Sequence, residues 1–371
     1  MIRVGVVLGE PTPYRAPQLD LVADAADPDL TVVYCSPTIQ RREWTIEPRH
    51  HAVFLDGPSL PLTRVLHHDY PLTPSIWRLL SRERFDVLVI GGWSLFGTQA
   101  AILWARLHHV PYLVMSENHL REPRPAWVRL LRRLVLPRIV GPAAGYLATG
   151  TLAREHALAY GARPEGVHVF PNTIDVDAFA ARVEAARARR DRHREEVRIP
   201  RDAVAVLTVG RLIPFKAADV LVDAVARAGD LLHLVVVGDG PERRMLEARA
   251  TRTTFAGFLD RDRLAEAYAA ADVFALVSRR ETWGVAVNEA MAASLPLVLS
   301  DRVGAAADLL VPGENGELVP VDDVDAAARA LSKLAADPAL RARYGARSRE
   351  LVAAWGYEPG VEAFVRAVTA A

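Results

Sequence analysis

Two cations stand where they could act together on one anionic ligand. Arg211 and Lys216 follow a short apolar run that ends at Gly210, and only two of the 45 basic residues of the chain are lysines. Two fixed positive charges beside the start of a helix suit a diphosphate, because exposed amides and the helix dipole already favour an anion there. The alternative is a salt bridge from Lys216 to Glu281 or Asp239 with no ligand involved.

Two carboxylates form a second pair, Glu281 and Glu289, with seven residues between them. If a helix begins near Gly284, Glu281 lies in the preceding loop and Glu289 lies inside the helix. A carboxylate accepts hydrogen bonds from both hydroxyls of a vicinal diol, at about 1.5–3 kcal/mol for each charge-assisted bond. A sugar nucleotide offers two such diols, so we expect Glu289 to bind the ribose and Glu281 the transferred sugar. The amides at the helix start would meet the phosphates, and this part of the site comprises Thr282, Trp283, Gly284 and Val285.

Glycines after three apolar runs would let a ligand approach the main chain. Gly210, Gly238 and Gly257 hold these positions, although a tight turn from strand to helix needs glycine equally. Main-chain groups near Phe258 could read the edge of a base. The Phe258 ring is equally well explained as ordinary core.

The elements that must position these residues are apolar, β-branched runs alternating with amphipathic segments. This alternation predicts an α/β protein with two Rossmann-like halves, each a parallel sheet covered by helices. In such sheets, ligands bind beyond the carboxyl ends of the strands. The runs are 2–8, 31–35, 86–92 and 111–116 in the first half, and 204–210, 232–240, 253–257, 273–278 and 295–300 in the second.

The predicted domains are residues 1–175 and 176–357, with a C-terminal helix at 358–371 that could pack back on the first domain. The charged segment 181–200 has few large apolar residues and is interpreted as a solvated helix or linker without a direct ligand role. At 371 residues, two domains of ordinary size are expected.

The composition excludes several classes of protein. Basic and acidic residues both total 45, which removes any bulk electrostatic argument for a nucleic acid partner. A single cysteine, Cys35, allows neither an intramolecular disulfide nor a cysteine-based metal cage. A small or neutral ligand and a reducing compartment are therefore expected.

The chain shows no signal peptide and no apolar run of about 18 residues, so a cytoplasmic location is expected. Segment 124–139 mixes arginines with Trp127 and several leucines. It could lie on an anionic membrane surface, with the protein peripheral on the inner face, or form a solvated surface helix without a lipid partner. The sequence leaves the oligomeric state open.

The first half should bind the acceptor. Tyr14 and Arg15 follow the first strand and would face the cleft between the domains, unless Tyr14 packs and Arg15 lies on the surface. Glu117, Asn118 and His119 follow another strand together.

The second half resembles the donor domain of retaining glycosyltransferases of family four, which have the GT-B fold. The resemblance rests on the glutamate pair within ETWGVAVNEAM together with VGRLIPFK and VVVGDGP, and it extends to the first half through FPNTIDVDAF at 170–179. One departure is Ala217, where the family usually has glycine. The GT-B fold implies two parallel sheets that face each other across a cleft.

The resemblance also implies a mechanism in which the sugar leaves its nucleotide and joins the acceptor on the same face. Arg211 and Lys216 would stabilise the diphosphate, and Glu281 would be a catalytic residue. His119 is expected beside the transferred sugar, although a structural histidine explains it almost as well. The co-substrate is expected to be a nucleotide-diphosphate sugar, most readily a UDP-sugar, with an unidentified acceptor and no cofactor.

No metal is expected if the two cations meet the diphosphate charge. Three acidic triplets, at 27–29, 175–177 and 260–262, are better explained as helix caps and turns than as metal ligands. Two other functions stay open: a non-catalytic protein that binds sugar nucleotides or glycans, and a sugar-nucleotide epimerase on the same fold.

Overall fold

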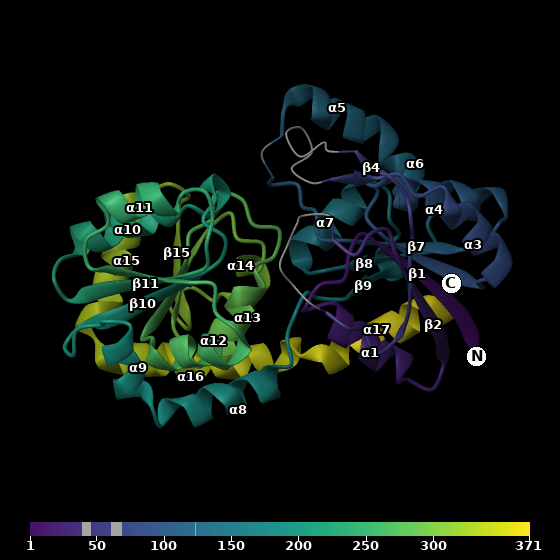
Figure 1. Ribbon diagram of the computed structural model, residues 1–371. Helices are drawn as coiled ribbons and strands as arrows, with labels where there is room; N and C mark the ends of the chain where they lie inside the picture. Colours follow the sequence, from purple (N-terminus) through teal and green to yellow (C-terminus); the bar gives the residue numbers. More distant parts are fainter. Residues whose placement is uncertain (39–45, 61–68, 123) are drawn as a thin grey trace. The chain divides into compact units, whose positions relative to one another are not determined.

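The computed structural model describes residues 1–38, 46–60, 69–122 and 124–371 (Figure 1). The chain divides into two compact units. Unit 1 comprises Met1–Leu120, Arg124–Asn172 and Tyr357–Ala371, and unit 2 comprises Thr173–Gly356 together with Arg121 and Glu122. The sequence placed the boundary after residue 175. Each unit is described by itself.

Unit 1 contains a parallel seven-stranded sheet in the order β3-β2-β1-β6-β7-β8-β9. Its strands are β1 (Ile2–Leu8), β2 (Pro28–Tyr34), β3 (His51–Phe54), β6 (Val87–Gly91), β7 (Tyr112–Ser116), β8 (Gly145–Ala148) and β9 (Val167–Val169). Strands β4 (Ser59–Leu60) and β5 (Tyr70–Pro71) form a separate antiparallel pair. The helices are α1 (Ala16–Ala23), α3 (Ser75–Glu83), α4 (Phe96–Leu107), α5 (Ala126–Val135), α6 (Pro137–Val140), α7 (Thr151–Ala159), η1 (Pro164–Gly166) and α17 (Tyr357–Thr369).

The sheet of unit 1 is buried on both faces, which explains why its strands are apolar runs without polar alternation. Along β6, Leu88 and Ile90 belong to one core cluster, and Val87 and Val89 belong to the other. The second cluster includes Phe364 of α17, whose ring centroid lies 5.2 Å from that of Phe170. The C-terminal helix therefore packs within unit 1, and it begins at Tyr357.

Unit 2 contains a parallel six-stranded sheet in the order β12-β11-β10-β13-β14-β15. Its strands are β10 (Val204–Val209), β11 (Leu232–Val237), β12 (Thr253–Gly257), β13 (Val273–Leu276), β14 (Leu297–Ser300) and β15 (Gly316–Val319). Its α-helices are α8 (Val176–Arg187), α9 (Arg190–Glu196), α10 (Ala218–Ala228), α11 (Arg243–Arg249), α12 (Arg261–Ala270), α13 (Val285–Ala292), α14 (Ala306–Leu309), α15 (Val324–Ala336) and α16 (Pro338–Val352), with 3-10 turns η2 (Pro214–Lys216) and η3 (Ala353–Trp355).

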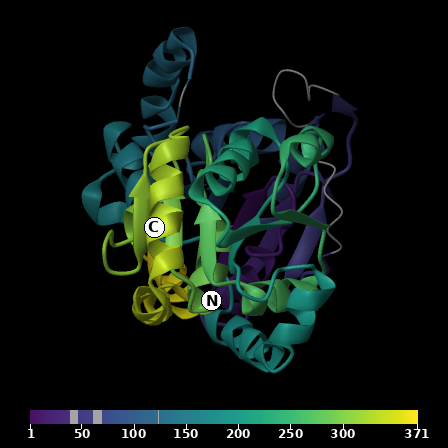
Figure 2. The ribbon, with the colours of Figure 1, turned by 90° about the vertical axis from the view of Figure 1, so that its left-hand side faces the viewer.

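Helices cover both faces of the unit 2 sheet (Figures 1 and 2). Successive residues of β10 enter opposite core clusters, Val206 with helices α10 and α15 and Leu207 with helices α8, α12 and α13. The prediction of an α/β protein with two Rossmann-like parallel sheets is confirmed. The sequence missed six strands, each of four residues or fewer and therefore too short to stand out: β3, β4, β5, β8, β9 and β15.

The charged segment 181–200 is helical but less solvated than expected. It forms most of α8 and all of α9, and Arg194 is buried with its guanidinium 3.0 Å from the Asp272 carboxylate. His193 is buried as well. The segment is therefore a packed part of unit 2, because its arginines reach carbonyls and a carboxylate at the end of α12.

Two of the acidic triplets act as helix caps, as predicted. Asp175 accepts a hydrogen bond from the amide of Ala178 at the start of α8, and Asp260 accepts one from the amide of Arg263 at the start of α12, both at 2.9 Å. Asp29 of the third triplet lies in β2. Within the described chain, no group of three or more His, Cys, Asp or Glu side chains is arranged to hold a metal ion.

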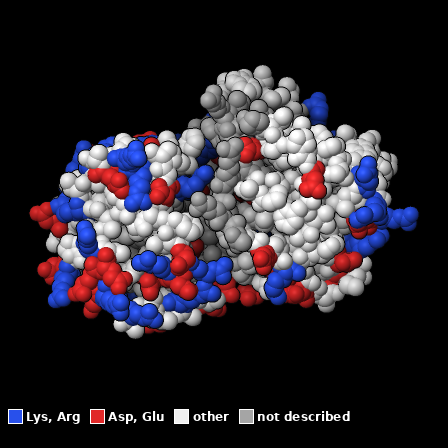
Figure 3. Space-filling view, in the orientation of Figure 1, with Lys and Arg blue, Asp and Glu red and all other residues white. Residues whose placement is uncertain are grey.

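The visible surface of unit 2 carries basic and acidic side chains side by side (Figure 3). Such mixing agrees with the formal net charge of zero. This face offers no broad region of one sign that a polyanion would need.

Candidate functional site

The strand order of unit 2 has a switch point between β10 and β13. These strands are neighbours in the sheet, but the chain leaves β10 toward one edge and returns at β13 toward the other. At such a switch point the loops after the two strands diverge and leave a crevice at the carboxyl edge. Arg211 and Lys216 follow β10, and Glu281 follows β13. The fold thus brings residues 65 positions apart to one place.

Lys216 and Glu281 form an ion pair in which the Lys216 ammonium donates to Oε2 of Glu281. The two side chains are 25% and 13% exposed, so both are reachable from solvent. A salt bridge to Glu281 is the alternative to a ligand site that the sequence leaves open, and the structure contains that salt bridge. Asp239, the other partner considered, pairs with Arg243 at 2.9 Å. Arg211 is exposed at the same strand exit.

Ala217, which stands where the resembled family usually has glycine, lies in a turn that favours glycine. Ala217 ends the 3-10 turn that carries Lys216, with φ 53° and ψ 38° in the left-handed region. Glycine adopts this conformation without steric cost, whereas an alanine there is strained. The buried Ala217 methyl packs into the core beneath α10.

The loop after β13 is fixed by main-chain hydrogen bonds to residues 303–305. The carbonyl of Glu281 accepts from the amide of Gly304, and the carbonyl of Trp283 accepts from the amide of Ala305, both at 3.0 Å. A side chain at Gly304 would overlap the Thr282 carbonyl, with a Cβ–O distance of 2.0 Å. Gly304 thus lets the main chain after β14 approach the main chain after β13.

Helix α13 begins at Val285, directly after Gly284, as predicted. Gly284 has φ 100°, which favours glycine. Trp283 does not face solvent: its side chain is buried and its indole N–H donates to Oδ1 of Asn288 at 3.1 Å. At this position only the main chain of Trp283 is suited to contact a ligand.

Glu289 lies on the second turn of α13 and is only partly exposed. Burial raises the pKa of this carboxyl to about 7, while a hydrogen bond from the Tyr268 hydroxyl at 2.7 Å acts in the opposite direction. The Tyr268 hydroxyl also lies 3.2 Å from the carbonyl of Ala286. Tyr268 therefore orients Glu289. The sequence gave no signal for this role, since Tyr268 stands in an alanine-rich helix.

Glycines allow the main-chain segments that follow neighbouring strands of unit 2 to approach each other closely. A Cβ on Gly238 would lie 2.0 Å from the Gly210 carbonyl oxygen, and Gly238 has φ 126°. Gly257 has φ 71°. Phe258, next to it, is 66% exposed, so its ring is not part of the core.

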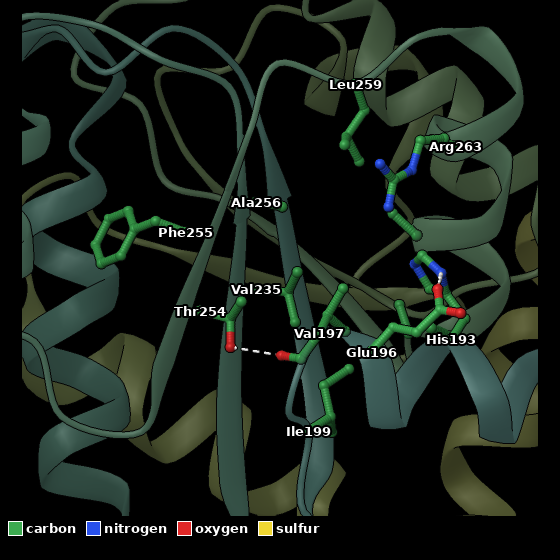
Figure 4. Close-up of a pocket in the computed structure, with 13 residues that line it drawn as sticks. His193, Glu196, Val197, Ile199, Val235, Thr254, Phe255, Ala256, Leu259 and Arg263 are labelled. Carbon is green, nitrogen blue, oxygen red and sulfur yellow. Dashed lines mark hydrogen bonds and ion pairs between the residues drawn. The ribbon is translucent and has the colours of Figure 1, made fainter.

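The hollow drawn in Figure 4 lies elsewhere in unit 2. It measures about 220 Å³ and is bordered by α9, β12 and α12, with Val235 of β11 at its floor. Its polar residues are His193, Glu196 and Arg263 alongside the Thr254 hydroxyl, which donates to the carbonyl of Val197 at 2.8 Å. None of the predicted site residues lines it.

In unit 1, the predicted acceptor residues also follow strands, but their environments differ. Arg15 was expected to face the cleft or the surface, yet it is buried. Its guanidinium donates to Gln18 Oε1 at 2.6 Å and to Oδ1 of Asn172, and it lies 4.2 Å above the centroid of the Phe170 ring. Burial lowers the pKa of Arg15 to about 10. Arg15 therefore acts as a structural centre of unit 1.

Asn172 links Arg15 to a predicted acceptor residue, because its amide donates to Oε2 of Glu117 at 2.7 Å. Asn118 receives a hydrogen bond at Oδ1 from Arg124, at 3.2 Å. His119 is buried after β7, and Tyr14 is partly exposed before α1. The structure thus groups Glu117 with Arg15 through Asn172, a residue that sequence reasoning missed.

Comparison with protein families matches most of the chain to two models. Residues 16–173 match a glycosyl transferase 4-like domain, and residues 189–351 match the glycosyl transferases group 1. The two matches correspond closely to the two units.

Individual relatives give the same result. A D-inositol 3-phosphate glycosyltransferase of Kribbella flavida is 31% identical over 79% of this chain and 68% of its own length. A GDP-mannose-dependent alpha-mannosyltransferase of Mycolicibacterium smegmatis is 36% identical over 56% of this chain and 52% of its own length. The chain thus spans between about half and two thirds of the curated relatives it matches.

The fold matches solved structures over its full length. The crystal structure of Anabaena HepE in complex with UDP-glucose superposes with a TM-score of 0.75 at 16% identity and covers 100% of both chains. A sucrose-phosphate synthase from Thermosynechococcus elongatus gives a TM-score of 0.74 at 21% identity, over 100% of this chain and 98% of that one. The predicted GT-B fold class is confirmed.

Proposed function

Because the chain belongs to the group 1 glycosyl transferases, we propose that it transfers a sugar from a nucleoside diphosphate to an acceptor, with a UDP-sugar as donor. The observation that supports the proposal is the ion pair between Lys216 and Glu281 at the switch point of the unit 2 sheet, with Arg211 exposed at the end of the same strand. Two cations, a carboxylate and the start of a helix at one edge of a parallel sheet suit the diphosphate and hydroxyls of an activated sugar.

In the proposed mechanism, Arg211 and Lys216 bind the diphosphate. As the bond from the sugar to the diphosphate breaks, negative charge grows on the leaving oxygens, and fixed cations there lower the barrier without reorganising. The ion pair with Glu281 holds the Lys216 ammonium at this exit before the donor arrives. We propose that these two cations suffice and that no metal takes part.

The two carboxylates orient the donor. Glu281 accepts hydrogen bonds from hydroxyls of the transferred sugar. Glu289, which Tyr268 orients, accepts hydrogen bonds from the ribose hydroxyls. The amides of Trp283, Gly284 and Val285 face the phosphates, with Thr282 completing this loop. Gly210 and Gly238 leave the ends of β10 and β11 free of side chains. The main chain at Gly257 and Phe258 contacts the base.

Unit 1 supplies the acceptor side of the same proposal. Tyr14, Glu117 and Asn118 would bind the acceptor and His119 would lie beside the transferred sugar, while Arg15 positions Glu117 through Asn172. The acceptor attacks on the face from which the diphosphate leaves, so the configuration of the sugar is retained. The product would carry the same anomeric configuration as the donor.

The donor can be identified without an acceptor, since slow hydrolysis of the bound sugar nucleotide needs only water. The protein is incubated with radiolabelled UDP-glucose, UDP-galactose, UDP-N-acetylglucosamine and GDP-mannose, with and without EDTA, and the released sugar is measured. We expect release from a UDP-sugar that EDTA does not abolish. Release from GDP-mannose alone would overturn the choice of UDP, and loss in EDTA would overturn the metal-independent mechanism.

The same incubation separates the other two functions. An epimerase converts the donor into a second sugar nucleotide, and a binding protein retains the donor unchanged. Either outcome would contradict glycosyl transfer, whereas retention of the anomeric configuration in a transferred product would support it.

A further inference from the structure

Helix α5 exposes an apolar stripe along its full length. Trp127, Leu130, Leu131, Leu134 and Val135 are 69%, 61%, 51%, 55% and 41% exposed. Their spacing of three and four residues places all five on one face of the helix. Such a face normally packs on a core, yet none of the ten residues of α5 is buried in the described chain.

The rest of unit 1 holds α5 by its opposite face. Arg132 donates to Nε2 of His156 at 2.8 Å, and its guanidinium lies 5.7 Å from the centroid of the Trp93 ring. Burial and the Arg132 charge lower the pKa of His156 to about 3, so His156 stays neutral and accepts this hydrogen bond. Arg132 lies on the side of the helix away from Leu130 and Leu134. Figures 1 and 2 both show α5 projecting from the body of unit 1.

The charged residues of the segment that carries the stripe are all of one sign. Residues 124–138 contain five arginines and no aspartate or glutamate. Arg129 and Arg133 are exposed on α5 itself. Two copies of this chain meeting through their stripes would bring these arginines together, and like charges disfavour that contact. A negatively charged apolar surface satisfies both features at once.

We propose that α5 is a docking surface for an anionic lipid bilayer. The apolar stripe enters the boundary between headgroups and acyl chains, with the Trp127 ring at headgroup depth, and the arginines contact lipid phosphates. A ten-residue helix is about 15 Å long, half the thickness of a bilayer core, so α5 lies along the surface. Among the described helices, none is long and apolar enough to cross a membrane.

Binding to vesicles tests the proposal independently of sugar transfer. The intact protein is sedimented with vesicles of phosphatidylcholine alone, or of phosphatidylcholine and phosphatidylglycerol in equal parts, at low and high salt. We expect binding to the anionic vesicles at low salt, weakened at high salt because exposed charges are screened, and little binding to the neutral vesicles.

Matched double variants separate the stripe from general surface effects. Leu130→Gln with Leu134→Gln removes two stripe residues one turn apart. The control is Leu103→Gln with Leu107→Gln, two leucines with the same spacing on α4 that are 53% and 59% exposed. We expect the α5 pair to weaken vesicle binding at least about tenfold and the α4 pair to leave it unchanged.

The arginines are tested in the same way. Arg129→Gln with Arg133→Gln should weaken binding to anionic vesicles several-fold, whereas Arg78→Gln with Arg82→Gln on α3 changes the net charge equally and should not. Four outcomes would overturn the proposal: no vesicle binding by the wild type, equal binding to neutral vesicles, equal effects of the α5 and α4 pairs, or a concentration-dependent dimer that the α5 pair alone abolishes. Circular dichroism confirms that each variant is folded.

Discussion

The strand exits of the two units hold charged residues of the same types in opposite environments. In unit 2, Lys216 and Glu281 pair with each other and stay reachable from solvent. In unit 1, Arg15 is buried against Phe170 and bonded to Gln18 and Asn172. A cation after the first strand of a Rossmann-like unit can thus stay within reach of solvent or be buried and hold the unit together. The environment of its guanidinium or ammonium decides which.

The largest effect is expected from removing the Lys216 ammonium. Lys216→Met should lower kcat for donor hydrolysis about 10²- to 10³-fold, because the leaving diphosphate loses one of two fixed cations, while the fold stays intact. Lys333→Met is the matched control: Lys333 is the other lysine of the chain and also forms an ion pair, with Glu317 at 2.6 Å. Equal activity of the two variants would mean that the Lys216 ammonium has no special role in donor hydrolysis.

Glu289 makes stability depend on pH at the unit 2 site. The folded-state pKa of about 7 lies above the ordinary value of 4.5, so below pH 4.5 the carboxyl is protonated in both states and costs nothing. As pH rises toward 7, the unfolded chain ionises first and the folded state loses stability. Glu289→Gln removes this dependence. Between pH 5 and pH 8, the free energy of urea unfolding of the wild type should fall by roughly 2–3 kcal/mol more than that of the variant. If the free energies of unfolding of both proteins changed equally with pH, the burial of the Glu289 charge would be contradicted.

The close approach of the unit 2 exits is tested by two glycines with similar backbones. Gly238 has φ 126° and a Cβ there meets the Gly210 carbonyl, whereas Gly229 has φ 97° and nothing lies within 4 Å of its Cβ position. Both alanine variants carry the backbone strain, of about 1 kcal/mol. Gly238→Ala should lose roughly 2 kcal/mol more in urea unfolding, because main-chain atoms must move. Equal losses would mean that the exits are not closely packed.

The smallest effect is expected from Arg15. Arg15→Met leaves acceptors on Gln18 and Asn172 unpaired but relieves a desolvated charge, so unfolding should become easier by roughly 1 kcal/mol. Nucleotide binding by unit 2 should be unchanged. The exposed Arg82→Met serves as the control. Loss of donor binding in Arg15→Met with unchanged stability would contradict the structural role of Arg15 and give it a role in ligand binding instead.

The sequence predicted the parts of the fold that depend on long apolar runs. Both parallel sheets, the start of α13 after Gly284 and the caps at Asp175 and Asp260 were predicted correctly. Each follows from local chemistry: buried strands must be apolar, a left-handed turn favours glycine, and a free amide at a helix start favours a carboxylate. Short strands such as β8 and β9 lacked that local signal.

Other features depend on contacts between distant segments, which no local pattern reports. Tyr268 reaches Glu289 across 21 positions, and Asn172 reaches Glu117 across 55. The burial of Arg15 likewise depends on Phe170, Pro171 and Asn172, which follow β9. The resemblance named the donor-side residues because its motifs are specific there. It gave less guidance in unit 1, where side chains are held by such distant contacts.

Nucleotide binding by unit 2 is tested most directly by titration calorimetry of the intact protein with UDP, GDP and ADP, repeated on Lys216→Met and Lys333→Met. We expect UDP to bind most tightly, Lys216→Met to weaken this binding at least about tenfold through loss of a charge-assisted contact, and Lys333→Met to leave it unchanged. Absence of binding by all three nucleotides, or equal affinity in the two lysine variants, would contradict it.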